Sequence, residues 1–409
     1  MKQLFKYAIY FIFLFFLSCE MEILVPQIPN VKIEKEIKGA KELTNIQKKL
    51  IDGLYLISDG KQDFGDTAVV KWNGNSLSIF VKKEQTYFVL YGGEIQKELV
   101  FAGYWRYSLS EELGFIKLII DESTSQKILN NEKPQSIRLN GEYHLNNQIK
   151  TISITYLKQL KNDSFYIIAH RGGGRNIDRL PASENSVELI EFAESLGANA
   201  IEIDVQLTKD SVPVLFHDEY FSKRLINQDF FIGKVSDYTY DLIESFVTLK
   251  NNEKIPTFEE ALSVALYKTN LKAVWIDVKS AEVVGRITQT IIYFQNKANQ
   301  AGRSFEIFLG IPEIGVLNSY LNNPDKSQIT ALCEMEPDIV EQSGALIWAP
   351  RWSLGLQTEE INNMHSKGKK VFTWTLDENV FIRKFIQKGS FDGILTNYPF
   401  LVAYEYYTN

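Results

Sequence analysis

A histidine and an arginine end an apolar, strand-like run in the second half of the sequence. His170 and Arg171 follow Tyr166–Ala169, and Gly172-Gly173-Gly174 comes directly after them. Glycines let the backbone approach a ligand closely. Where strands alternate with helices, the carboxyl end of a strand is where catalytic groups lie. This pair is a candidate for acid–base chemistry or anion binding, although a pair of this kind can also simply cap a loop.

Two carboxylates lie in the next strand-like run, Ile201-Glu202-Ile203-Asp204-Val205. Residues two apart in a strand face the same side, so Glu202 and Asp204 point together. Buried carboxylates are costly unless they are paired or bound to a metal. Their oxygen atoms suit Mg²⁺ or Ca²⁺. The alternative is a pair neutralised by a neighbouring lysine or arginine.

A second histidine returns to the level of these carboxylates. A tight reversal at Lys209-Asp210 would make Val212–Phe216 an antiparallel flap and would place His217 opposite Glu202.

A third strand-like run carries Asp277 and Lys279 on one face. Asp277 could complete a three-carboxylate site for one divalent cation, and Lys279 could hold a phosphate oxygen. Two histidines can serve as general base and general acid. A bound cation and nearby positive side chains neutralise the charge that develops on a phosphoryl group. Together these residues form a set suited to phosphodiester cleavage.

The elements that must position these residues alternate between strands and helices from Phe165 to the end. Eight strands over about 245 residues fit a (β/α)₈ barrel, with a doubly wound open sheet as the alternative. The predicted strands are Tyr166–His170, Ala200–Val205, Ala273–Val278, Phe305–Leu309, Ile329–Cys333, Ala345–Trp348, Val371–Leu376 and Gly393–Thr396.

The preceding segment, residues 20–160, has a different pattern. After a tether with Pro26 and Pro29 come many short β-rich runs separated by Gly, Asn and Asp clusters. This spacing predicts a small antiparallel barrel or sandwich, and the pattern does not separate the two. The domain could bind a glycan or a lipid, or could act as a spacer. We therefore predict three parts: a leader at 1–19, the β-rich domain at 20–160 and the barrel at 161–409.

The motifs of the barrel resemble those of the glycerophosphodiester phosphodiesterase family. They occur in order as His170-Arg171-Gly172, Ser183-Glu184-Asn185-Ser186, Glu202-Ile203-Asp204, His217-Asp218, Asp277-Val278-Lys279, Trp374-Thr375 and Thr396-Asn397-Tyr398-Pro399. The resemblance covers about Phe165 to Pro399 and does not extend to the β-rich domain.

The resemblance implies a role for each matching residue. His170 and His217 would be the catalytic acid and base, and Arg171 and Lys279 would bind phosphate. Trp374 would line the substrate site, or would belong to the core. The metal ligands would be Glu202, Asp204 and Asp277. Asp277 stands where the family usually has Glu. The related venom sphingomyelinase D-type phospholipases have the same Asp-x-Lys pattern as this chain.

The implied reaction is metal-dependent hydrolysis of a small glycerophosphodiester to glycerol 3-phosphate and an alcohol. One alternative is a lysophospholipase D or cyclising phospholipase that acts on lysophospholipids. Another is a surface lipoprotein that binds a glycan or lipid without catalysis. The net charge of −7, with no long Lys/Arg run, argues against a nucleic-acid partner.

The amino terminus has the features of an export signal. Lys2 and Lys6 precede an apolar run that ends in Phe16-Leu17-Ser18-Cys19, which looks like a bacterial lipobox. We expect lipidation of Cys19 and an exported, membrane-anchored lipoprotein, periplasmic or at the cell surface. The alternative is a cleaved secretory signal with an incidental cysteine. Cys333, the other cysteine, is expected to be a small core residue.

Overall fold

The computed structural model describes residues 26–110, 112–161 and 164–409. The predicted signal peptide and Cys19 lie outside the described residues. None of the helices in these described ranges has both the length and the apolar character that a membrane span requires.

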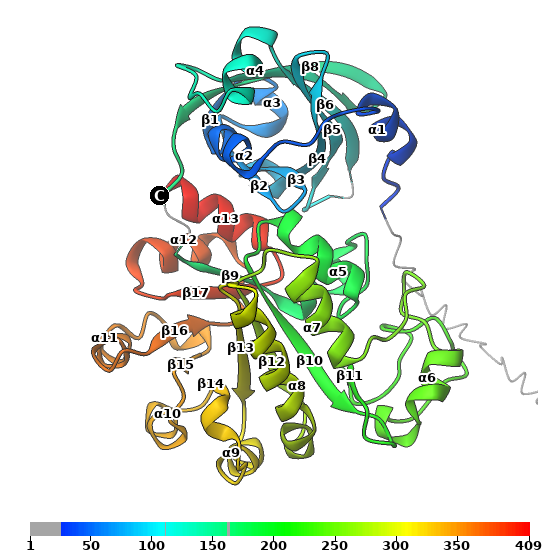
Figure 1. Cartoon of the computed structure of the whole chain (residues 1–409), viewed down its shortest axis with the longest axis vertical. Helices are drawn as coiled ribbons and strands as arrows, with labels where there is room; N and C mark the ends of the chain where they lie inside the picture. The colour runs from blue at the N-terminus through cyan, green and yellow to red at the C-terminus, as the bar shows by residue number, and fades with distance from the viewer. Residues whose placement is uncertain (1–25, 111, 162–163) are drawn as a thin grey trace, which may run out of the picture.

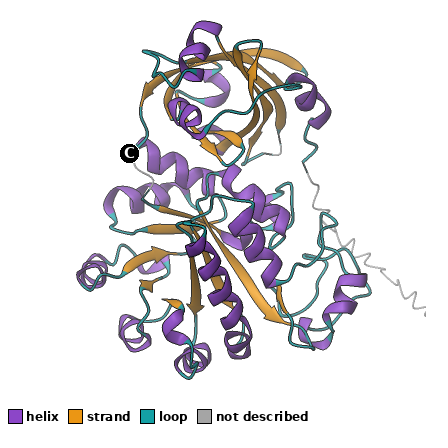
Figure 2. Ribbon diagram, viewed as in Figure 1, coloured by secondary structure: helices purple, strands orange, loops and turns teal. Residues whose placement is uncertain are grey.

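The first domain is a closed antiparallel barrel, which decides between the two architectures predicted for it (Figures 1 and 2). Neighbouring strands pair in sequence order, and β1 also pairs with β8 to close the sheet. The strands are β1 (Gly53–Asp59), β2 (Thr67–Asn73), β3 (Ser76–Val81), β4 (Thr86–Ile95), β5 (Glu98–Tyr107), β6 (Leu113–Ile120), β7 (Arg138–Leu145) and β8 (Gln148–Lys158). The helices are α1 (Asn30–Glu36), α2 (Asn45–Ile51), α3 (Lys61–Phe64) and α4 (Glu122–Leu129).

Aromatic side chains fill the interior of this barrel around Phe64. Phe64 is fully buried, and its ring lies 4.8 Å from that of Tyr143 and 5.5 Å from that of Trp105. These edge-to-face contacts combine large apolar area with favourable ring geometry.

We therefore expect Phe64→Ala to lower the free energy of unfolding of this barrel by about 3–5 kcal/mol, because a large cavity would remain. Denaturant unfolding would measure the change. Phe230→Ala is the matched control, since Phe230 is 74% exposed and should change stability by no more than about 0.5 kcal/mol. An equal, small effect of both substitutions would contradict the prediction.

The second domain is an eight-stranded parallel barrel, as predicted, with one additional antiparallel strand. Strands β17 and β10 both pair with β9 and so close it. The barrel strands are β9 (Tyr166–Ala169), β10 (Ala200–Leu207), β12 (Ala273–Val278), β13 (Glu306–Ile311), β14 (Thr330–Cys333), β15 (Ile347–Trp348), β16 (Lys370–Thr373) and β17 (Gly393–Thr396). Around them lie α5 (Val187–Phe192), α6 (Tyr240–Phe246), α7 (Phe258–Tyr267), α8 (Ala281–Gln300), α9 (Ile314–Leu321), α10 (Pro337–Ser343), α11 (Thr358–Ser366), α12 (Asn379–Lys388) and α13 (Pro399–Thr408).

The additional strand is β11 (Pro213–Leu215), which pairs antiparallel with β10. Its predicted register is wrong by one residue. The turn contains three residues, Lys209 to Ser211, and pairs Thr208 with Val212, because Ser211 adopts a left-handed backbone with φ 63°. Val205 therefore pairs with Leu215, and His217 is displaced by one position from the predicted partner Glu202.

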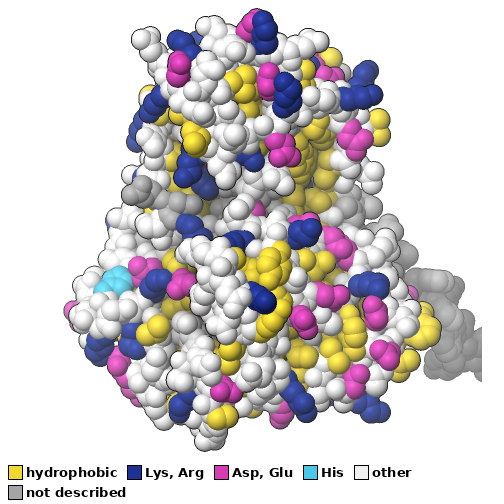
Figure 3. Space-filling view, viewed as in Figure 1, with side chains coloured by type: hydrophobic (Ala, Val, Ile, Leu, Met, Phe, Trp, Pro, Cys, Tyr) yellow, Lys and Arg dark blue, Asp and Glu magenta, His cyan; other side chains and the backbone are white. Residues whose placement is uncertain are grey.

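The two barrels contact each other through β2 and β3 of the first and through α13 and the segment before β10 of the second (Figure 1). Ser78 donates a hydrogen bond of 2.9 Å to the backbone oxygen of Ser195, and Thr67 lies 2.7 Å from the hydroxyl of Tyr404. Figure 3 shows the first barrel seated on the wider second barrel, with a waist between them.

Candidate active site

The two strands β10 and β12 bring together the three predicted metal ligands. Asp204 and Asp277 pair directly in the parallel register, and Glu202 lies two residues before Asp204 on the same face. One carboxylate oxygen from each residue lies within 4.8 Å of the others. The alternating Ile201 and Ile203 are fully buried against the surrounding helices. Strand alternation therefore turns the acidic face into the barrel, as predicted.

Burial and mutual repulsion set the charge state of these carboxylates. The pKa of Glu202 is raised well above its usual range by burial first, and then by Asp204 and Asp277. Burial opposes ionisation of Asp204 too, but the charges of Lys279 and Arg171 and of the two histidines together outweigh it, and the net pKa is lowered. Burial raises the pKa of Asp277 despite the nearby Lys279. Three carboxylates thus share a space in which full ionisation is unfavourable, and hard oxygen ligands of this kind fit a divalent cation.

Lys279 neutralises part of this charge. Its Nζ lies 2.6 Å from Asp204 Oδ1 and 2.6 Å from Asp277 Oδ2. Burial would lower the pKa of the Lys279 ammonium, but the two aspartates raise it. The paired arrangement that we considered as the alternative for the acidic strand is therefore present. It also keeps an ammonium group against the carboxylate cluster.

His170 lies at the end of β9 with its two ring nitrogens facing different partners. Nδ1 lies 2.8 Å from Asn397 Oδ1, and Nε2 lies 3.8 Å from Glu202 Oε2. The amide of Asn397 is oriented because its Nδ2 donates to Asp377 at 2.7 Å. Asn397 thus accepts the hydrogen from Nδ1 and leaves Nε2 without a proton. Burial first, and then the charge of Arg171, lower the pKa of His170 to about 4.

His217 has a carboxylate partner instead. Its Nδ1 lies 2.7 Å from Asp218 Oδ1, and Arg224 Nη2 lies 2.6 Å from the same oxygen. Burial opposes ionisation of Asp218, but hydrogen bonds from Arg224 and His217 give a net lowering of its pKa. An ionised carboxylate at Nδ1 stabilises a positive imidazolium and orients Nε2.

Arg171 is held in place by both its backbone and its side chain. Its backbone N–H donates to Glu202 Oε2 at 2.8 Å, and Nη1 donates to Glu184 at 2.7 Å. Arg171 itself has a left-handed backbone, with φ 54°. Asn185, also left-handed, donates to Asp204 Oδ2 at 2.7 Å, so it orients a carboxylate rather than capping α5. The cap of α5 is Ser186.

A cavity of about 250 Å³ joins most of these groups. Trp374 lines it half-buried, with its indole donating to the backbone oxygen of Ala349 and with Arg351 4.6 Å above the ring. The lining residues are His170, Arg171, Glu202, His217, Trp275, Asp277, Glu334, Trp374, Thr375 and Leu395. Six of the eight predicted barrel residues therefore line one cavity. Lys279 contacts the cavity wall through Asp277, and Asp204 joins the others through the carboxylate cluster.

Several residues of the site had no assigned role in the sequence analysis. Asn397 and Asp218 lie within the quoted motifs, but only the structure reveals that they orient the two histidines. Glu334 belongs to none of the motifs. It follows β14, where its position at a strand's carboxyl end was the available signal. Burial, and then Asp277, raise the pKa of Glu334 to about 8.

Comparison with known proteins points to the same family that the sequence motifs resemble. Residues 170–305 match the model of the glycerophosphoryl diester phosphodiesterase family. A glycerophosphodiester phosphodiesterase of Caldanaerobacter subterraneus is 26% identical over 256 residues, which cover 57% of this chain and 94% of the relative. One from Bacillus altitudinis is 26% identical over 246 residues, 57% of this chain and 94% of the relative. The crystal structure of a Thermotoga maritima glycerophosphodiester phosphodiesterase covers 59% of this chain and 98% of its own, with 20% identity and a TM-score of 0.45. Over residues 170–305, and through its ordered motifs, the parallel barrel of this chain therefore matches the glycerophosphoryl diester phosphodiesterase family, a family of phosphoric diester hydrolases.

Proposed function

We propose that the barrel hydrolyses a small glycerophosphodiester to glycerol 3-phosphate and an alcohol, with a divalent cation, Mg²⁺ or Ca²⁺, at Glu202, Asp204 and Asp277. The observation that carries this proposal is the convergence of three carboxylates and two oppositely partnered histidines on one cavity. When bound, the cation would neutralise phosphate charge and lower the pKa of an attacking hydroxyl.

The partners of the two histidines support different roles for them. Burial first, and then the charge of Arg171, lower the pKa of His170, and the Asn397 oxygen holds the remaining ring proton on Nδ1, so Nε2 is free to accept a proton. His170 would therefore take the proton from the attacking group, either water or the glycerol 2-hydroxyl. His217 meets a carboxylate at Nδ1, which orients its Nε2. His217 would protonate the leaving alcohol as its bond to phosphorus breaks.

The positive side chains would bind the phosphate and keep it in line. Lys279 reaches the cluster from the side of Asp204 and Asp277, and Arg171 lines the same cavity. Fixed cations aimed at the developing charge act strongly in a site from which water is excluded. Trp374 lines the same cavity and would contact the substrate there. If Cys19 carries a lipid, this chemistry would take place outside the cytoplasm, on head groups released at the membrane surface.

We expect the purified protein to release glycerol 3-phosphate from glycerophosphocholine or a related diester when Mg²⁺ or Ca²⁺ is present, and to release none in EDTA. Coupled detection of glycerol 3-phosphate measures the reaction, and restoring the cation after EDTA is the control. Lysophosphatidylcholine forms a second arm of the assay. Release of choline from that lipid alone would replace the proposed substrate by a lysophospholipid, and cation-independent release would contradict the role of the carboxylates.

A further inference from the structure

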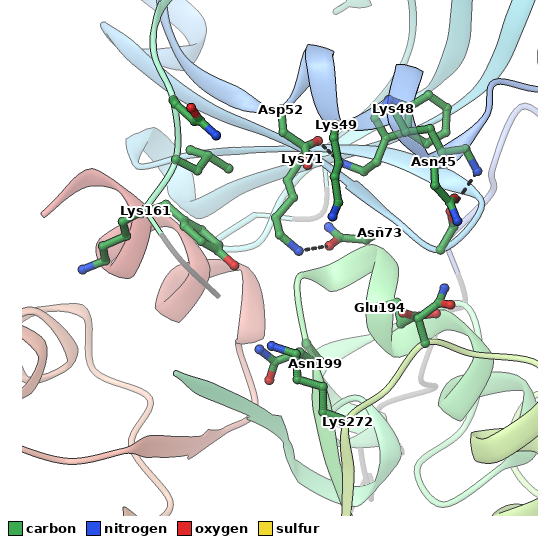
Figure 4. Close-up of a pocket in the computed structure, with 17 residues that line it drawn as sticks. Asn45, Lys48, Lys49, Asp52, Lys71, Asn73, Lys161, Glu194, Asn199 and Lys272 are labelled. Carbon is green, nitrogen blue, oxygen red and sulfur yellow. Dashed lines mark hydrogen bonds between the residues drawn. The ribbon is translucent and has the colours of Figure 1, made fainter. Parts of the chain in front are cut away.

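A second and larger cavity, of about 580 Å³, lies between the two barrels (Figure 4). One wall comes from α2 and β2 of the antiparallel barrel. The other wall comes from Glu194 and from residues just before the strands of the parallel barrel. Asn199 directly precedes β10, and Lys272 directly precedes β12. The catalytic groups lie toward the carboxyl ends of these strands, so the interdomain cavity lies at the opposite end of the barrel.

The lining of this cavity is rich in positive charge. Five lysines face two carboxylates, Asp52 and Glu194, which leaves a net charge of +3. The lysines come from both domains: Lys48, Lys49, Lys71, Lys161 and Lys272. Dark blue Lys and Arg side chains are also visible along the waist between the barrels in Figure 3. A concave site with an excess of one sign of charge concentrates ligands of the other sign.

Two of these lysines are held by aromatic rings and a carbonyl rather than by acids. Lys48 Nζ lies 4.9 Å from the centre of the Trp72 ring and donates to the backbone oxygen of Gly74 at 3.3 Å. Lys161 Nζ lies 3.9 Å above the Tyr406 ring. Neither forms an ion pair with any acid that the structure describes. Their charge is therefore available to a bound anion.

The β2 wall of this cavity also contains a side-chain donor, on Asn73, with no acceptor among the described residues. Asn73 is only 6% exposed, and its Oδ1 accepts a 2.9 Å hydrogen bond from Lys71, which Figure 4 marks with a dashed line. Its Nδ2 is buried without a partner. A buried donor that makes no hydrogen bond is costly. The missing partner of Nδ2 is therefore an acceptor.

We propose that the cavity between the barrels binds a phosphate monoester or inorganic phosphate, with Asn73 and the lysines of both domains as donors. A phosphate monoester carries nearly two negative charges at neutral pH and presents three strong acceptor oxygens, which match a donor-lined cavity of net charge +3. The volume lies in the range of small-molecule sites. This site is separate from the proposed reaction and does not depend on it.

The sharpest test is Asn73→Asp, which keeps the oxygen that accepts from Lys71 and replaces the unmade donor by a negative acceptor. Equilibrium dialysis with labelled inorganic phosphate, repeated with glycerol 3-phosphate, would count sites on the intact protein. We expect two sites in the parent protein. In Asn73→Asp, one of them should bind at least tenfold more weakly, while hydrolysis of a soluble glycerophosphodiester stays unchanged.

Asn363→Asp on α11 is the matched control, because it makes the same change of charge at an exposed asparagine of the second barrel. It should leave both sites intact. Lys279→Ala should weaken the other site, in the active-site cavity, and leave the Asn73-dependent one. If Asn73→Asp and Asn363→Asp bound phosphate equally well, the proposal would be overturned. Loss of all bound phosphate in Lys279→Ala would overturn it too. A single site that depends on Asn73 would support this proposal while counting against the proposed reaction.

Discussion

Replacing His170 by alanine is expected to lower kcat for glycerophosphodiester hydrolysis by about 10²–10⁴-fold, the usual contribution of a positioned general base. Three contacts underlie this expectation. Asp377 orients the amide of Asn397, Asn397 accepts from Nδ1 of His170, and Nε2 is left facing the carboxylates. Alanine removes the proton acceptor without removing any of the three acidic side chains. Steady-state kinetics at saturating substrate and cation would measure the loss.

His144→Ala is the matched control for this substitution. His144 lies in the antiparallel barrel, where its Nε2 is 2.8 Å from Lys32 Nζ and its ring packs edge-on against Phe115. Its loss should leave kcat unchanged. Cation binding by His170→Ala should also persist, because the three carboxylates remain. If His170→Ala kept more than about a tenth of the parent kcat, His170 would not be the base, and the amide-held ring would have a structural role only.

The barrel and most of its site could be predicted because their signals are local. Apolar runs mark all eight strands, and two-residue alternation assigns Glu202 and Asp204 to one face. The position of His217 shows the limit of this reasoning. Its predicted register assumed a two-residue turn, but Ser211 adopts a left-handed conformation and adds one residue. A serine carries no strong preference for that conformation, so the pattern contains no sign of the change.

The closure of the first barrel and the orientation of the histidines depend on contacts between distant residues. β1 and β8 are about one hundred residues apart, and no local pattern states whether they pair. Asn397 lies 227 residues after His170 in the sequence, although their side chains are 2.8 Å apart. The cavity between the domains combines residues from α2 to α13. None of the five lysines that line this cavity belongs to a recognisable motif, so the cavity could be found only in the folded chain.

Glu202→Gln is expected to change activity and stability in opposite directions. In the parent protein without a cation, burial and the two aspartates raise the pKa of Glu202 above that of the unfolded chain. The folded state therefore binds the proton more tightly, and the free energy of unfolding falls as pH rises through and above the usual range for Glu. Glutamine has no charge to bury, keeps an oxygen for the Arg171 N–H and places an amide donor beside the aspartates.

The cation-free Glu202→Gln protein should consequently be at least as stable as the parent at neutral pH, and its stability should depend less on pH. The parent should gain about 2.7 kcal/mol at a cation concentration one hundred times Kd, whereas the variant should gain little and should lose hydrolysis. Thermal unfolding with EDTA or with Mg²⁺ or Ca²⁺ separates the two effects. Equal stabilisation of parent and variant by the cation would place the ion elsewhere. If Glu202→Gln were much less stable than the parent in EDTA, the ionised glutamate would itself be a structural contact.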